Sequence, residues 1–139
     1  MTPLALRDLD LRAVLSVAGA LFGAWLLLVL VFTWRGQPGV VCLTPVLWLL
    51  AIVAGKGTPA YSRSTEPAAR RAEAGLAGGL LGVLQGMLFT VMTQVMGETT
   101  PQERLTMALV GVAVIFGGLL VCTVTAFAMA ALVERGIWR

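Results

Sequence analysis

The polar side chains best suited to bind a solute lie within one long apolar stretch of this chain. Gln85 sits near its middle, and Thr90, Thr93 and Gln94 follow toward its far end. Amides and hydroxyls are weak acids and bases, but they can coordinate an ion or hydrogen-bond across helices. An amide without a partner is costly in lipid, so we expect Gln85 to lie buried between helices with a hydrogen-bond partner. The alternative is a pore-lining or substrate-contacting role for Gln85.

The groups that most enzymes need are missing from the apolar stretches. The chain contains no histidine, which is the commonest axial ligand of haem and a major metal ligand. The apolar stretches, at 13–34, 40–54, 74–96 and 105–133, also lack Asp, Glu, Lys and Arg, whereas proton relays and cation-coupled transporters normally use one. Cys42 and Cys122 are predicted at different depths, about 20 Å apart and beyond disulfide distance. We therefore predict a non-enzyme with no catalytic, cofactor-binding or metal site.

Composition indicates that the helices cross a membrane. The 139 residues are 58% hydrophobic and 12% charged, whereas soluble domains carry about 25% charged residues. The mean hydropathy is +0.91. Four apolar segments are each near the length that crosses about 30 Å of hydrocarbon. We predict an all-α integral membrane protein, a single domain of four transmembrane helices in two antiparallel hairpins. The helices are expected at about 13–34, 40–54, 66–97 and 101–135.

The distribution of basic residues predicts the orientation. Basic residues gather at both chain ends and in the polar stretch between the second and third helices, and the opposite loops hold only Arg35 and Arg104. The positive-inside rule then places both termini in the cytoplasm. We expect a bacterial cytoplasmic membrane, and we attribute the net charge of +3 to its lipid-facing side rather than to nucleic-acid binding. The residues expected at lipid headgroups or the cytoplasmic face are Lys56, Arg63, Arg70 and Arg71.

Glycines recur at helical spacing. Gly75, Gly79, Gly82 and Gly86 are separated by steps of four, three and four, which places them on one stripe of the third helix. In lipid such a stripe lets another helix approach closely. The residues predicted to pack helices together are Gly19, Gly23, Gly75, Gly79, Gly82, Gly86, Gly117 and Gly118.

Three local signals predict where helices begin and end. Asp10 is a candidate cap for the first helix. Thr100 and Glu103 have the spacing of a capping box, with Pro101 at the first helical position. Loop-forming residues are concentrated in the range 55–62, so we predict a loop there.

These patterns favour one function and leave two alternatives open. The favoured hypothesis is a structural or accessory subunit of a larger membrane complex, in contact with membrane lipids and with other subunits or copies of itself. A homo-oligomeric channel or transport component, lined by Gln, Thr and Gly of the third helix, is the alternative. A binder of an apolar ligand or pigment is the third hypothesis, and its residues would be Phe22, Trp25, Trp48 and Phe89.

Overall fold

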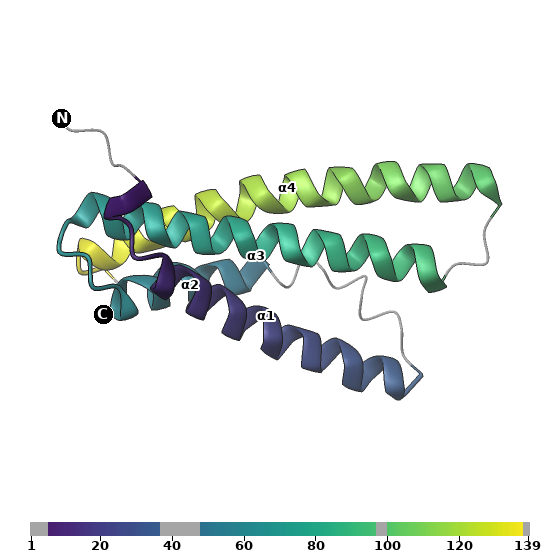
Figure 1. The fold of residues 1–139 in the computed structure, drawn as a ribbon, viewed down its shortest axis with the longest axis horizontal. Helices are drawn as coiled ribbons and strands as arrows, with labels where there is room; N and C mark the ends of the chain where they lie inside the picture. Colours follow the sequence, from purple (N-terminus) through teal and green to yellow (C-terminus); the bar gives the residue numbers. More distant parts are fainter. Residues whose placement is uncertain (1–5, 37–47, 97–99, 138–139) are drawn as a thin grey trace.

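The computed structural model describes residues 6–36, 48–96 and 100–137, and every regular element in that part of the chain is helical. These elements are a short 3-10 helix, η1 (Leu6–Asp8), and the α-helices α1 (Leu11–Trp34), α2 (Trp48–Tyr61), α3 (Pro67–Met96) and α4 (Pro101–Glu134) (Figure 1). The all-helical class is therefore confirmed. The predicted bounds of the first, third and fourth helices agree with α1, α3 and α4 within about two residues.

Three of these helices, α1, α3 and α4, are long and apolar enough to cross a membrane. The fourth, α2, has 14 residues. At 1.5 Å per residue it spans about 21 Å, which is less than the roughly 30 Å of a hydrocarbon layer. Three of the four predicted spans therefore correspond to helices long enough to cross a membrane. Residues 40–47 of the predicted second span lie outside the described residues.

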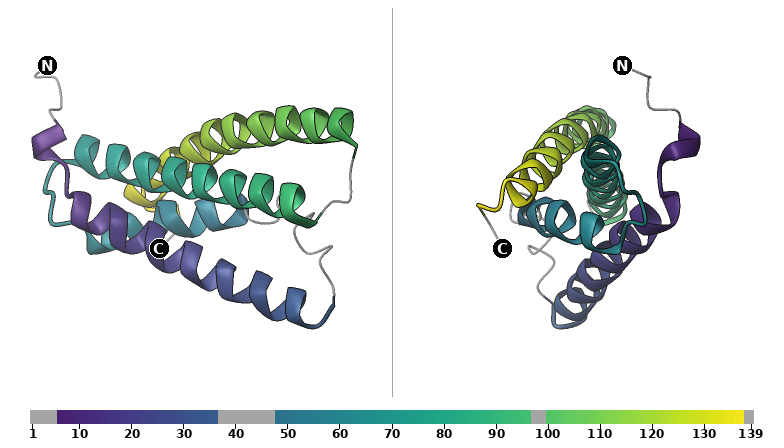
Figure 2. Two further views of the ribbon diagram at one scale, coloured as in Figure 1. Left: turned by 45° about the vertical axis from the view of Figure 1, so that its right-hand side comes forward. Right: turned by 90° about the vertical axis from the view of Figure 1, so that its left-hand side faces the viewer.

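The helices form a bundle built on the antiparallel pair α3 and α4. These two helices share the most extensive contact, α2 packs against both of them, and α1 packs against α3 and α2. Figures 1 and 2 show α1 diverging from the other helices toward its C-terminal end. The η1 helix, the α2–α3 connection and the end of α4 all lie at one end of the bundle (Figure 1).

The predicted loop at 55–62 is wrong, because α2 continues to Tyr61 with Pro59 inside it. Gly55 serves packing rather than a turn: a Cβ atom added there would lie 2.6 Å from the carbonyl oxygen of Ala126 in α4. The Thr58 hydroxyl is buried and donates to the carbonyl of Ala54 at 2.7 Å. Close packing against α4 therefore outweighs the low helix propensity of this segment.

Both predicted N-terminal caps are confirmed. The Asp10 side chain accepts a hydrogen bond from the Ala13 N–H at 3.3 Å and caps α1. Thr100 and Glu103 form a reciprocal capping box at the start of α4. At the other end of α4, Gly136 has a φ of 74°, a left-handed conformation that suits glycine after a helix.

At Gly82 and Gly118 the backbones of α3 and α4 come into direct contact. A Cβ atom added at Gly118 would lie 3.0 Å from the carbonyl oxygen of Gly82, and one added at Gly82 would overlap the carbonyl group of Gly118. Two backbones therefore meet with no side chain between them. This contact lets the neighbouring side chains of both helices interlock over most of the length of the pair.

We predict that Gly82→Ala destabilises the bundle. The added methyl group has only backbone atoms to displace, and overpacking of this kind typically costs about 1–3 kcal/mol. The matched control is Gly117→Ala, because an added Cβ at Gly117 meets nothing within 4 Å. The control should keep or slightly raise stability, as alanine is the better helix former. Unfolding of both variants in detergent micelles, followed by circular dichroism, checks this; equal stability of the two variants would contradict it.

Candidate functional site

Gln85 is buried on α3, at a position between two hydrophobic clusters that join α3 to α1 and α2. One hydrophobic cluster lies toward the charged end of the bundle, and a second is centred on Trp25 and Val29 of α1. On α3, Ala77 belongs to the first cluster and Leu88 to the second, and Gln85 lies between them in the sequence. The members of the first cluster are Val14, Val17, Ala54 and Ala77, with Leu21 packed against them.

The Gln85 side chain is buried without a hydrogen-bond partner. Only 1% of the residue is exposed, and within the described part of the chain neither its Oε1 nor its Nε2 has a partner. The expected partner of Gln85 is therefore not found there. A buried amide that makes no hydrogen bond costs about 1–3 kcal/mol, and both polar atoms of the Gln85 side chain are unpaired within the described chain.

The other predicted polar residues bond to nearby backbone rather than to a shared site. Thr90 donates its hydroxyl hydrogen bond to the Gly86 carbonyl at 2.8 Å, and Thr93 donates to the Thr90 carbonyl at 2.9 Å. The Gln94 amide donates to the Arg104 carbonyl at 3.1 Å, linking the ends of α3 and α4. Within the described chain these three side chains are hydrogen-bonded to backbone carbonyls, whereas Gln85 is not hydrogen-bonded.

The charged end of the bundle holds a buried carboxylate on α3. Glu73 is fully buried, and its Oε1 accepts hydrogen bonds from the Asp10 N–H at 2.7 Å and from the Ser64 hydroxyl at 2.5 Å. Its Oε2 has no partner among the described residues. Glu73 is four residues from Ala69 and four from Ala77, and both alanines are buried. Because residues four apart share a helix face, this spacing indicates a buried position for Glu73.

Asp10 links three segments at this end. Besides capping α1, its carboxylate accepts a hydrogen bond from the Arg63 N–H at 3.0 Å, after the end of α2. This bond is the main cause that lowers the pKa of Asp10 below its ordinary value of 3.8, with help from the Ala13 N–H and the nearby Arg63 charge. The N-terminus of α1 is thereby tied to the α2–α3 connection and, through Glu73, to α3.

The four predicted headgroup residues divide into two pairs. Arg70 donates to the Ser64 carbonyl at 2.7 Å, and Arg71 forms an ion pair with Glu134 of α4 at 3.2 Å. Both guanidinium groups therefore stabilise the end of the bundle. Lys56 and Arg63 are exposed, so their side chains can reach lipid or solvent.

The predicted packing glycines fall into two groups, those that lie close to another helix and those with open space around them. Gly79 and Gly86 lie close to α4, where an added Cβ at Gly86 would come within 2.7 Å of the Ile115 Cα. Gly75 has ordinary contacts at 3.7 Å with α4 side chains. In contrast, an added Cβ at Gly19 or Gly23 of α1 meets nothing within 4 Å. The same open space surrounds Gly117 of α4.

No metal centre is assembled by the described residues. In the ranges 6–36, 48–96 and 100–137, no three side chains from His, Cys, Asp and Glu come together in a way that could hold a metal ion. The arrangement at Glu73 instead resembles a structural polar network, in which one carboxylate collects backbone and hydroxyl donors from separate segments.

We predict that Gln85→Met keeps or raises the stability of the isolated chain. Methionine has a similar volume and leaves no buried polar group unpaired, so the substitution removes a desolvation cost. Leu81→Ala, at a fully buried neighbour on α3, should instead cost about 2–5 kcal/mol and shows that the assay detects lost packing. Denaturant unfolding in micelles measures both. A loss above about 1 kcal/mol for Gln85→Met would mean that the amide has a partner.

Asp10 should make the fold sensitive to acid. The pKa of Asp10 is lower in the folded chain than its ordinary value of 3.8. Its contribution to the free energy of unfolding is therefore complete above that value and is lost as the pH falls through the folded pKa. The stability difference between the wild type and Asp10→Asn should therefore shrink as the pH drops below 3.8. Thermal unfolding as a function of pH measures this, with Glu66→Gln as an exposed-carboxylate control. A difference that is independent of pH would contradict the prediction.

Comparisons with known proteins do not assign this arrangement to a family. No family model matches the chain, and no match is found among curated proteins or solved structures. The function is therefore argued from the geometry: one satisfied polar network at the charged end, one unsatisfied amide in the bundle, and open glycine positions on α1 and α4.

Proposed function

We propose that this chain is a non-catalytic structural subunit of a larger membrane complex, and that α1 and α4 carry its contact surfaces. The observation that carries the proposal is the open space at Gly19, Gly23 and Gly117. Glycine inside a helix costs about 0.5–1 kcal/mol relative to alanine. That cost is offset where the missing side chain lets another helix approach. On α3 the approaching helix is α4 of the same chain, whereas on these faces the described chain supplies no neighbour.

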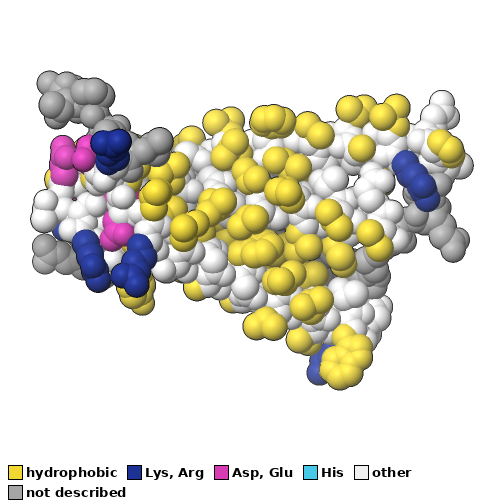
Figure 3. All heavy atoms as spheres, viewed as in Figure 1, with side chains coloured by type: hydrophobic (Ala, Val, Ile, Leu, Met, Phe, Trp, Pro, Cys, Tyr) yellow, Lys and Arg dark blue, Asp and Glu magenta, His cyan; other side chains and the backbone are white. Residues whose placement is uncertain are grey.

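The surrounding surface has the character expected of helices that contact lipid or other membrane proteins. On α1, Leu15 and Leu27 are 62% and 65% exposed, and on α4, Phe116 and Leu120 are 65% and 67% exposed. In Figure 3 the hydrophobic side chains cover the middle of the visible face, and the charged side chains lie near its ends. An apolar middle between charged ends supports a membrane-spanning orientation of the bundle.

We also propose that the charged end faces the cytoplasm of a bacterial cell. The described basic residues at the η1 end of the bundle outnumber those at the opposite end, where Arg35 and Arg104 lie. The positive-inside rule favours this orientation, with both termini cytoplasmic and the chain in the cytoplasmic membrane. The Arg71–Glu134 pair and the Asp10–Glu73 hydrogen bond then lie in the headgroup region.

The channel alternative has less support. A pore between copies would need polar side chains on an outer face, but Gln85 is 1% exposed within a single chain. The hydroxyls of Thr90 and Thr93 are bonded to backbone carbonyls of their own helix. The pigment-binding alternative has a similar difficulty, because Phe22 and Phe89 pack against Trp25 in a filled core cluster.

The decisive variant combines Gly19→Leu with Gly23→Leu. Because nothing lies within 4 Å of either position, the isolated chain should fold and become slightly more stable, since leucine is the better helix former. Its capture of partner subunits from native membranes should fall about tenfold or more, because the added side chains hold a second helix away. Quantitative co-purification from the original host measures this.

The matched control is Leu28→Phe, which adds bulk at an exposed position of α1 that lies off the four-residue stripe of Gly19 and Gly23. It should leave co-purification unchanged. If the glycine double variant and the control both retain all partners, α1 is not a contact surface. If neither variant nor wild type captures any other membrane protein, the subunit proposal itself fails.

A further inference from the structure

A second surface of the molecule has a different chemistry. Between α1 and α2, at the charged end of the bundle, lies an open pocket of about 300 Å³. Its lining combines cationic, hydroxyl and carboxylate side chains from both helices and from the segment after α2. These residues are Asp10, Arg12, Ala13, Ser16, Tyr61 and Arg63.

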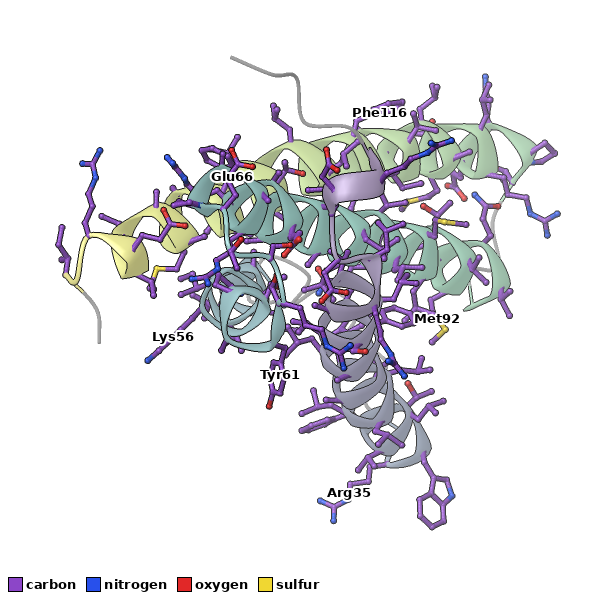
Figure 4. The ribbon with its side chains drawn as sticks, turned by 60° about the vertical axis from the view of Figure 1, so that its left-hand side comes forward. Arg35, Lys56, Tyr61, Glu66, Met92 and Phe116 are labelled. Atoms are coloured by element: carbon purple, nitrogen blue, oxygen red, sulfur yellow. The ribbon has the colours of Figure 1, made fainter. Side chains whose placement is uncertain are left out.

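The pocket offers hydrogen-bond donors that the fold does not use. Arg12 and Arg63 are both exposed, and within the described chain neither guanidinium group makes a hydrogen bond or an ion pair. The one carboxylate, Asp10, already accepts hydrogen bonds from two backbone N–H groups. Tyr61 projects outward from the end of α2 (Figure 4), and its hydroxyl adds a further donor. Among the residues that line the pocket, two cations accompany one carboxylate.

Exposed apolar residues follow the pocket at helical spacing on both α1 and α2. On α1, Ser16, Ala20 and the next residue of that row, Ala24, recur every four residues and are exposed. On α2, Val53 and Leu49 follow the same four-residue step away from Tyr61 and are also exposed. Residues four apart share a helix stripe, so a charged head and a smooth apolar row lie next to each other along each helix.

We propose that this pocket binds the phosphate of an anionic phospholipid, with one acyl chain lying along the apolar rows of α1 and α2. Arginine pairs with phosphate through geometrically matched N–H donors. Tyrosine at the edge of the hydrocarbon layer places an apolar ring and a polar hydroxyl at the headgroup level. Free phosphate would use the cationic head alone, whereas a phospholipid uses the head and the adjoining apolar rows. The proposal goes beyond the structural role and does not depend on a partner subunit.

The test uses the full chain in detergent, titrated with phosphatidylglycerol and read by native mass spectrometry. Arg12→Gln combined with Arg63→Gln should lower the affinity about tenfold or more, because both phosphate-binding groups are lost. The matched control is Lys56→Gln combined with Arg135→Gln. It removes the same charge from exposed residues of the same end that do not line the pocket. In Figure 4, Lys56 projects from α2 away from α1. The control should change the affinity less than about twofold.

Two further arms separate a lipid site from a phosphate site. Inorganic phosphate, added at the concentration that saturates with phosphatidylglycerol, should not displace the lipid. Ala20→Leu, which fills the apolar row without touching the charges, should weaken phosphatidylglycerol binding severalfold. Equal losses for the two charge variants would show general surface attraction and overturn the proposal. Displacement by inorganic phosphate, or unchanged binding in Ala20→Leu, would also overturn it. Circular dichroism of each variant confirms that the helices are intact.

Discussion

The backbone contact between α3 and α4 at Gly82 and Gly118 is the constraint on which the rest of the bundle depends. In lipid there is no hydrophobic driving force between helices, so association relies on close packing. A side chain at Gly82 would overlap the backbone of α4 and push the helices apart, and α2, which packs against both, would lose the surface formed by the pair. Gly55 makes a second contact of this kind, because it lets α2 pack against the backbone of α4 at Ala126.

The polar network at the charged end complements this apolar packing. Glu73 accepts hydrogen bonds from the segment before α1 and from the α2–α3 connection. The Arg71–Glu134 ion pair joins the start of α3 to the end of α4. Each link ties together elements far apart in the sequence, at the end where water and headgroups can satisfy the remaining groups. Inside the bundle no comparable network forms among the described residues, and Gln85 stays without a partner.

Helix positions could be predicted where the determining signal is local, and they could not where packing decides. The capping groups Asp10 and Thr100 act on the adjacent turn, so sequence alone located the starts of α1 and α4. The segment around Gly55 has the composition of a loop. Gly55 itself packs against the backbone of α4 at a residue some 70 positions away along the chain. The burial of Glu73 likewise depends on donors contributed by distant segments. The unpaired state of Gln85 could not be foreseen, because the expectation of a partner concerns the whole bundle rather than the helix that carries it.

The open glycine faces on α1 and α4 give the bundle its proposed role, and the composition of its assembly in the native membrane tests that role most directly. The measurement is native mass spectrometry of material extracted from the original host with its surrounding lipid. We predict particles in which this 14.6 kDa chain is accompanied by at least one membrane protein of different sequence. Particles that contain only this chain and lipid would contradict the proposal, and a defined homo-oligomer among them would favour the channel alternative instead.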